Sequence, residues 1–476
     1  MTTRLMLVSL SEVSDVYTVR KTEHIPITKG GCIMKKELFF KVSTVVVLIG
    51  LMFAGQALAA KPFEGKTLQV IMIADPWVPA FQKINPEFEE LTGAKVVINS
   101  YGYDATHEKQ VLEGSQESEA FDVIVLDSPW VGEFWEAGYV EDLKPYIEKS
   151  DPAEVRYDDF VEVFRVISEW DGHIVGMPFG AYFVTLDYRK DLFDEEGLAP
   201  PTTLEEWKAI ADVFTNNPDY PGMFGLAMNN QQGSPVGQAW FEYIWNVGGK
   251  PFESCYPGSP DPYADMTPLF DSPESIEVVN LMKEMLQYQP PGSLSMAWDE
   301  RAQAFASGIV AMVSAWSVRT PIFLDPNRSA IADKFASAVI PSKEGVGPVP
   351  PVGGWVMGIS KFSTQKDLAW EYTKWFTSPE IHKKFVDAGG PPSRYSALQD
   401  PELSAKYPWF DTIEKSAAMA YADCRPRIPE SFEIISTVGI YVSRALSGEL
   451  SAEEAMQKAN EEIKTLLQKG GYNMSE

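Results

Sequence analysis

Acidic and aromatic side chains recur together where short β-rich runs end, and these residues could bind a polar ligand. Asp75 and Trp77 follow one such run, and Asp127 and Trp130 follow another. Three further aromatic candidates stand at comparable points: Tyr182, Trp316 and Trp355. In open α/β sheets, ligands bind outside the carboxyl ends of the strands. Aromatic rings there stack on the C–H faces of a sugar and carboxylates accept its hydroxyls, so the pattern predicts a sugar site.

Core packing is the competing interpretation for any single tryptophan of the thirteen in the chain. Five tryptophans on or beside helical stretches are expected to pack in the core: Trp135, Trp170, Trp207, Trp370 and Trp375. The coincidence of strand-end aromatics with acids is what favours a binding site over packing alone.

Motifs typical of catalysis are missing from the sequence. It contains no GxSxG, HExxH, phosphate-binding loop or GxGxxG pattern, and its four histidines do not fall at metal-ligand spacing. We therefore expect no catalytic residue, no metal and no cofactor. A glycosidase needs only two carboxylates brought together in space, so a secreted carbohydrate-active enzyme stays an alternative.

A secretion signal is expected at residues 34–59. Lys35 and Lys36 form a basic start, Val42 to Phe53 is apolar, and Ala57-Leu58-Ala59 has the small-x-small cleavage pattern. Residues 1–33 are then a misassigned extension, and the cleaved protein is periplasmic. A membrane anchor is the alternative, because residues 42–60 are uncharged.

Charge excludes some partners. The first sixty residues contribute 7 basic and 4 acidic residues, so the remainder carries 33 basic and 63 acidic side chains and a net charge of −30. Such a surface repels nucleic acid, and no nucleic-acid partner is expected. Cys255 and Cys424 are the cysteines beyond the signal, and the sequence leaves open whether they form a disulfide.

Strands alternate with amphipathic helical stretches, which is typical of α/β layers. We expect strands at 67–74, 95–101, 121–127, 174–178, 183–188, 309–315, 336–341 and 355–360. Two capping boxes, Thr203 with Glu206 and Ser451 with Glu454, predict helix starts. Ser-Pro pairs at 272–273 and 378–379 predict two more, and Gly470-Gly471 predicts the end of the last helix.

Ordered motifs along the chain resemble those of family 1 extracellular solute-binding proteins, the maltose-binding-protein-like subunits of sugar ABC importers. These motifs are Leu91–Val96, Phe121–Ile124 with Gly138-Tyr139, Gly176–Pro178 with Leu186–Phe193, Pro201–Trp207, Phe305–Gly308 with Ala311-Met312, Val352–Trp355 with Gly358–Ser360, and Arg425–Pro429. Leu204 replaces the family's usual tryptophan.

The resemblance implies an α/β, two-lobed periplasmic-binding-protein fold of type II, with crossing hinge segments and a ligand cleft between the lobes. Lobe one would be 61–180 plus 336–412, and lobe two 181–335 plus 413–476. By resemblance, Asp75 and Asp127 accept sugar hydroxyls, Trp316 and Trp355 stack, and Tyr182 contacts the ligand at the first crossover. The remaining expected ligand-binding residues are Gln238, Trp240, Gly354, Arg394 and Arg425. For Arg394 and Arg425, an ion pair between the lobes or at the hinge is an equally good interpretation.

The implied function is capture of a sugar or oligosaccharide by hinge closure and its delivery to the transmembrane subunits of an ABC permease. The protein would act as a monomer and without catalysis. The same fold binding a polyamine, a phosphorylated polyol or another non-sugar solute is the alternative.

Overall fold

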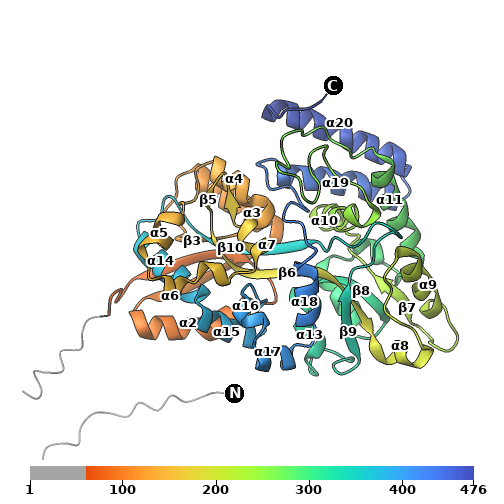
Figure 1. The fold of residues 1–476 in the computed structure, drawn as a ribbon, viewed down its shortest axis with the longest axis horizontal. Helices are drawn as coiled ribbons and strands as arrows, with labels where there is room; N and C mark the ends of the chain where they lie inside the picture. Colours follow the sequence, from red (N-terminus) through yellow and green to blue (C-terminus); the bar gives the residue numbers. More distant parts are fainter. Residues whose placement is uncertain (1–60, 476) are drawn as a thin grey trace, which may run out of the picture. The chain divides into compact units, whose positions relative to one another are not determined.

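The structure, a computed structural model, describes residues 61–475 (Figure 1). The expected signal peptide and the extension before it lie outside these residues. From Lys61 onward the chain forms one compact unit. Within the described part, no helix is long and apolar enough to cross a membrane.

One mixed sheet runs through the described chain in the order β2-β1-β3-β10-β6-β8-β7, with β9 also paired to β6. Its strands are β1 (Thr67–Ile73), β2 (Lys95–Tyr101), β3 (Val123–Asp127), β6 (Met177–Arg189), β7 (Phe224–Ala227), β8 (Val310–Trp316), β9 (Phe335–Val339) and β10 (Val352–Ile359). β4 (Glu169–Trp170) and β5 (His173–Ile174) form a separate pair.

β6 connects two lobes. Residues 177–183 of β6 pair antiparallel with β10, and residues 184–189 pair antiparallel with β8 and β9. In Figure 1, β3, β10 and the helices around them lie on one side of β6, while β7, β8 and β9 lie on the other. We call the side that contains β1 the first lobe and the side that contains β7 the second lobe.

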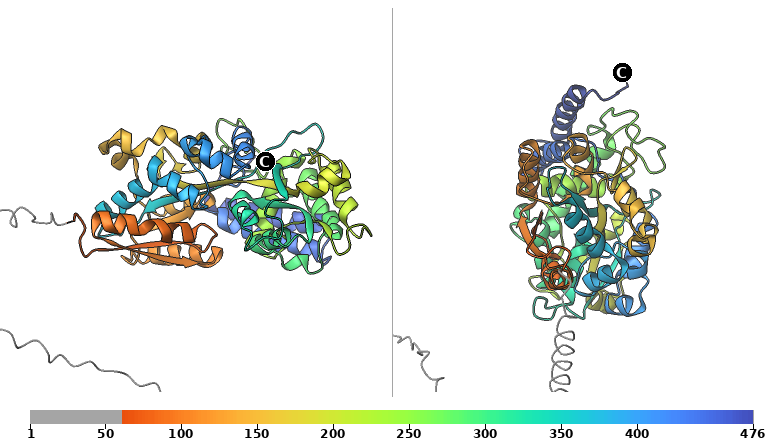
Figure 2. Two further views of the ribbon diagram at one scale, coloured as in Figure 1. Left: turned by 90° about the horizontal axis from the view of Figure 1, so that it is seen from below. Right: turned by 90° about the vertical axis from the view of Figure 1, so that its left-hand side faces the viewer.

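Helices cover both lobes (Figure 2). Those of the first lobe are α2 (Val78–Thr92), α3 (Tyr103–Ser115), α4 (Val131–Glu136), α5 (Lys144–Lys149), α6 (Pro152–Val155), α7 (Glu162–Val166), α14 (Lys366–Thr377) and α15 (Pro379–Asp387), followed by α16 (Tyr395–Leu398) and α17 (Pro401–Lys406). Those of the second lobe are α8 (Lys190–Glu196), α9 (Leu204–Phe214), α10 (Ser234–Tyr243), α11 (Pro273–Met285), α12 (Trp298–Ala306), α13 (Thr320–Leu324), α18 (Phe410–Ala417), α19 (Ser431–Leu446) and α20 (Ala452–Gly470).

Local sequence signals place the helix ends well. Both capping boxes form, at the starts of α9 and α20, and Ser272 caps α11. Gly471 ends α20 in the left-handed conformation that glycine adopts without steric cost. Ser378 precedes α15 as expected, but its hydroxyl bonds to the carbonyl of Trp375 and does not cap the helix.

The expected strands are found with two corrections. The runs 174–178 and 183–188 were expected as separate strands, yet residues 177–189 form the single strand β6. β7 was not expected, because its four residues, Phe-Gly-Leu-Ala, are too few to show a period. Pairing with the longer β8 holds these four residues extended.

Candidate functional site

A cavity lies where strands of both lobes end, with about 330 Å³ of empty space, part of it open to solvent. Its wall is formed by Ile73, Asp75, Tyr103, Asp127, Tyr182, Gln238, Trp298, Trp316, Arg319, Trp355 and Arg425.

The first lobe supplies the acids of the wall. Asp75 follows β1, and Asp127 is the last residue of β3, which runs parallel to β1. Parallel strands bring their carboxyl ends to one edge, so the two acids reach the same side of the sheet. Trp355 lies there too, because β10 runs antiparallel to β3 and pairs Trp355 with Asp127.

The second lobe supplies most of the remaining wall. Trp316 ends β8, and Arg319 ends the short 3₁₀ helix η6 (Ser317–Arg319) that follows. Gln238 lies on α10, and Trp298 is the first residue of α12. Tyr182 comes from β6, where the strand passes from one lobe to the other.

Aromatic rings make up much of the lining. The ring of Tyr182 meets Trp316 edge-on at 5.5 Å between centroids, and Tyr103 meets Trp355 edge-on at 6.1 Å. The indole N–H of Trp355 donates to the Tyr182 hydroxyl. The exposed fractions of Trp316 and Trp355 are 4% and 2%, and both rings line the cavity. Trp298 packs on Tyr103 at 5.5 Å across the two lobes.

Asp127 forms a buried ion pair with Arg425. Nη1 and Nη2 of Arg425 donate to the two carboxylate oxygens at 2.8 and 3.0 Å. The hydroxyl of Tyr103 and the backbone N–H of Ser128 donate to the same carboxylate, each at 2.8 Å. Burial lowers the pKa of Arg425, but the charge of Asp127, its hydrogen bond and the nearby Tyr103 together raise it, and the net shift is upward. The carboxylate of Asp127 therefore accepts its hydrogen bonds from groups of the protein itself, and it holds Arg425 in place.

Asp75 is bound less completely. Its Oδ2 accepts the indole N–H of Trp77 at 3.1 Å, and its Oδ1 lies 3.3 Å from Nη2 of Arg319. Burial raises the pKa of Asp75, and the Arg319 charge opposes that rise. Burial lowers the pKa of Arg319, yet Asp75 and Asp299 raise it, and the net shift is upward.

Three polar atoms of the wall have no hydrogen-bond partner among residues 61–475: Oδ1 of Asp75, Nε2 of Gln238 and Nε of Arg425. A buried polar group without a partner costs about 1–3 kcal/mol. One acceptor and two donors beside aromatic rings are what a ligand with several hydroxyls can satisfy. In the described residues, no group of three His, Cys, Asp or Glu side chains could hold a metal ion.

Five of the expected site residues lie outside the cavity wall. Trp77 and Trp130 are buried behind it, both packed on Trp355. Trp240 packs on Phe270 in the second lobe at 4.9 Å. The other two are Gly354 and Arg394.

Contacts within the fold explain the residue type at Gly354 and at Arg394. A Cβ at Gly354 would lie 2.1 Å from Cδ1 of Ile167. The fully buried Arg394 donates to the carbonyls of Thr377, Arg156 and Val155. These partners and Asp159, 3.4 Å from Nη1, all belong to the first lobe, so Arg394 neither lines the cavity nor forms the expected ion pair between the lobes or at the hinge.

Sequence reasoning missed Tyr103, Trp298 and Arg319. Tyr103 follows β2 closely, as Trp77 follows β1, so the strand-end pattern could have found it. Trp298 and Arg319 stand at helix termini and carried no comparable signal.

Gly353, not Gly354, is the glycine that leaves room for the cavity's rings. A Cβ at Gly353 would lie 2.5 Å from Cε2 of Tyr182 and 3.0 Å from Cζ3 of Trp316.

Comparison with known proteins identifies the family. Residues 74–383 match the bacterial extracellular solute-binding protein family. The chain belongs to this family. A solute-binding protein of Agrobacterium radiobacter, solved in complex with ribitol, is 32% identical, with a TM-score of 0.80 over 85% of this chain and 100% of that one. The expected family and the two-lobed fold are thus confirmed.

Two curated relatives differ in their named ligands. A probable amino-acid ABC transporter periplasmic-binding protein of Sinorhizobium fredii is 24% identical over 88% of this chain and 94% of its own length. A mannitol-binding protein of Pseudomonas aeruginosa is 26% identical over 67% and 76%. Family members bind small molecules and work with ABC permeases.

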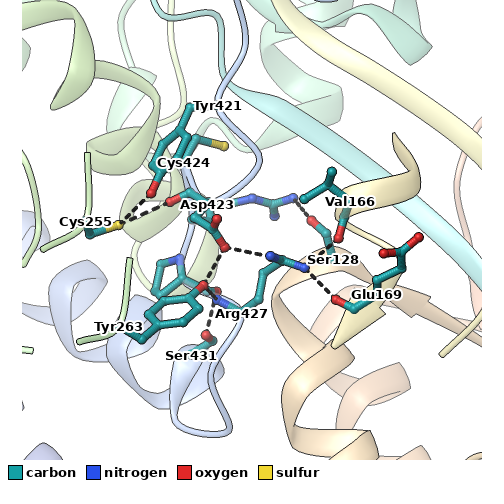
Figure 3. A network of polar contacts seen from close by, with 12 residues as sticks. Ser128, Val166, Glu169, Cys255, Tyr263, Tyr421, Asp423, Cys424, Arg427 and Ser431 are labelled. Atoms are coloured by element: carbon teal, nitrogen blue, oxygen red, sulfur yellow. Dashed lines mark hydrogen bonds and ion pairs between the residues drawn. The ribbon is translucent and has the colours of Figure 1, made fainter. Parts of the chain in front are cut away.

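In this solute-binding protein, the segment between α18 and α19 touches both lobes (Figure 3). Arg427 donates to the carbonyls of Val166 and Glu169 in the first lobe, each at 2.7 Å. On the second-lobe side, the hydroxyl of Tyr263 accepts from the Arg427 backbone at 2.9 Å and donates to Asp423 at 2.6 Å. This segment also carries Arg425, so a ligand that contacts Arg425 acts directly on a connection between the lobes.

The two cysteines of the described residues are free thiols. The thiol of Cys255 donates to the carbonyl of Asp423, and that of Cys424 to the carbonyl of Val352. Burial raises the pKa of Cys255 and raises that of Cys424 to about 11, so both stay protonated and unreactive at neutral pH.

Proposed function

We propose that this solute-binding protein captures a sugar or small polyol in the cavity between its lobes and presents it to an ABC permease. The observation that carries the proposal is the cavity wall itself. It combines edge-packed aromatic rings with two donors that lack a partner, Nε2 of Gln238 and Nε of Arg425, and with Oδ1 of Asp75, which has an ion-pair contact but no hydrogen bond; its charges are balanced, two aspartates and two arginines. A neutral ligand with hydroxyls satisfies the free atoms without leaving a net charge buried.

Charged ligands fit this wall less well. A polyamine would add positive charge where each aspartate already faces an arginine. A phosphorylated polyol would need a free cationic group, and both guanidinium groups are engaged.

A zwitterionic amino acid is the second candidate, because of the relative in Sinorhizobium fredii. It would have to separate Asp75 from Arg319, or Asp127 from Arg425, to pair its own charges. A buried charge left without its partner costs about 3–5 kcal/mol, so the charges of the amino acid would have to replace both partners in full. A neutral polyol needs no such separation, which favours it.

Closure of the lobes around the ligand follows from contacts between them. The hydroxyl of Ser234 in the second lobe donates to Asp104 of the first lobe at 2.7 Å, and Arg319 reaches Asp75. A ligand that binds across these lobes stabilises the closed form. Moving the equilibrium from 1:99 to 99:1 takes about 5.5 kcal/mol of differential binding.

Titration calorimetry with ribitol, mannitol, maltose, glutamate and spermidine tests the proposal. We expect heat of binding with at least one of the three carbohydrates and none with glutamate or spermidine. Binding of glutamate or spermidine, with no response to the carbohydrates, would refute it.

Two tryptophan variants test the cavity as the site. Trp316→Ala and Trp355→Ala each remove a ring from the wall. In a fluorescence titration, each should lower the affinity for the carbohydrate at least tenfold or abolish binding. Trp240→Ala removes a fully buried ring of the same lobe as Trp316 but away from the cavity, so it is the control. Equal affinities for all three variants would place the ligand elsewhere.

The remaining parts of the proposal concern the intact protein. The chain acts as a periplasmic monomer that binds without turnover. Residues 61–180 and 336–412 make lobe one, and 181–335 and 413–476 make lobe two. One refinement is suggested by β9, which pairs with the second-lobe half of β6, so the crossing back to lobe one comes after Val339.

A further inference from the structure

A second, larger hollow adjoins the cavity between the lobes. This outer groove has about 930 Å³ of empty space, much of it open solvent, and is lined by Gln82, Asp299, Gln303, Ile322 and Arg328 among others. Asp75 lines both the cavity and the outer groove. The boundary between the two spaces therefore passes through Asp75.

Arg319 closes that boundary. Its guanidinium lies 3.3 Å from Oδ1 of Asp75, across the lobes, and bonds to Oδ1 of Asp299 at 2.9 Å. Arg319 lines the cavity, whereas Asp299 lines the outer groove. The side chain of Arg319 is 8% exposed and that of Asp299 is 74% exposed, so the guanidinium is shielded from solvent while its partner on the side of the outer groove is not.

We propose that Arg319 determines ligand length in this protein, by forming with Asp75 and Asp299 a wall that confines the ligand to one sugar-sized unit. This rests on the function proposed above and adds a size limit to it. The space inside this wall is the smaller of the two, about 330 Å³ against about 930 Å³ for the outer groove. A longer saccharide would have to pass through the place that Arg319 occupies and continue into the outer groove.

The geometry of the three residues makes the wall a property of the closed form. Asp75 belongs to the first lobe and Arg319 to the second, so their contact breaks when the lobes part. Arg319 and Asp299 both belong to the second lobe and stay together, which keeps the guanidinium positioned for the next closure.

Two substitutions at Arg319 separate the volume of the side chain from its charge. Arg319→Ala removes both. Arg319→Met removes the charge but keeps a long side chain in the wall. Both variants leave Asp75 without its cation, so a loss of affinity caused by the missing charge should be the same in both.

The experiment measures the dissociation constants of ribitol and of the disaccharide alcohol maltitol for the parent and both variants. In the parent we expect ribitol to bind and maltitol to bind at least tenfold more weakly. The ratio of the maltitol dissociation constant to the ribitol dissociation constant should be at least tenfold lower in Arg319→Ala than in Arg319→Met. Equal ratios in the two variants would overturn the proposal. If the parent binds neither compound nor any other carbohydrate, the proposed function fails, which is a distinct result.

Folding of the variants is checked by thermal unfolding. Should Arg319→Ala fail to fold, a crystal structure of the parent with its bound carbohydrate decides the question. The ligand is expected to end against the guanidinium of Arg319. A ligand that extends past Arg319 into the outer groove would refute the wall.

Discussion

Gly353→Ala adds one methyl group beside the proposed ligand. The new Cβ would lie 2.5 and 2.9 Å from two ring carbons of Tyr182 and 3.0 Å from Cζ3 of Trp316. These distances are shorter than van der Waals contact, and the obstacles are ring atoms of two buried side chains. The backbone of Gly353 lies in β10, so the conflict is one of space and not of backbone conformation.

The expected size of the effect follows from the cost of overpacking. Forcing an extra carbon into a filled interior costs about 1–3 kcal/mol. Tyr182 and Trp316 form part of the cavity wall, so relief of the overlap must move rings that the ligand contacts. If this cost falls entirely on the bound form, affinity falls by up to roughly 140-fold, at about 1.4 kcal/mol for each factor of ten.

Gly180→Ala is the matched control. Gly180 stands opposite Trp355 in the neighbouring strand β6, and a Cβ there would meet Pro391 at 3.5 Å and Trp355 at 3.7 Å, which are ordinary contacts. Both variants are titrated by calorimetry with the carbohydrate that binds the parent best. We expect Gly180→Ala to bind like the parent and Gly353→Ala to bind more weakly. Parent-like affinity in Gly353→Ala would refute the claim that its neighbouring rings form the site.

Three other predictions concern stability, each checked by urea unfolding. Burial raises the pKa of Asp187 from 3.8 to about 7, so the folded state keeps a proton that the unfolded state loses between these values. The free energy of unfolding of the parent therefore falls progressively from about pH 4 to 7, by up to about 4 kcal/mol. Asp187→Asn should be more stable than the parent at pH 8 but not at pH 4. A difference in stability that does not depend on pH would contradict this. Asp127→Ala leaves Arg425 buried without its counter-charge and should cost about 3–5 kcal/mol, so a loss below 1 kcal/mol would show that the pair is solvated. Ser451→Ala removes the cap of α20 and should cost about 1 kcal/mol, whereas an unchanged midpoint would mean that this helix end is frayed.

Much of the architecture is readable from local sequence. The capping boxes at Thr203 and Ser451 and the left-handed Gly471 depend on residues within a few positions of each other, and the structure confirms them. The strand-end pattern also brought Asp75, Asp127 and Trp355 together correctly, because parallel and antiparallel pairing at one sheet edge follows general rules.

The roles of individual site residues were not readable in this way. Arg394 and Arg425 looked equivalent in the sequence, but Arg394 is bound to carbonyls of the first lobe while Arg425 reaches the cavity. Asp127 looked like a free acceptor until its bond to Arg425, 298 residues away, was apparent.

The chain by itself thus determines its family, its α/β layers and the edge where the acids and aromatic residues gather, since these follow from periodicity, capping and ordered motifs. Tertiary structure alone decides which polar atoms at that edge remain free, because each buried donor or acceptor is satisfied by whichever partner the fold brings within about 3 Å. It also decides that Arg319 of one lobe meets Asp75 of the other. No local sequence pattern predicts this contact, because it forms only when two lobes pack together whose contacting residues are hundreds of positions apart.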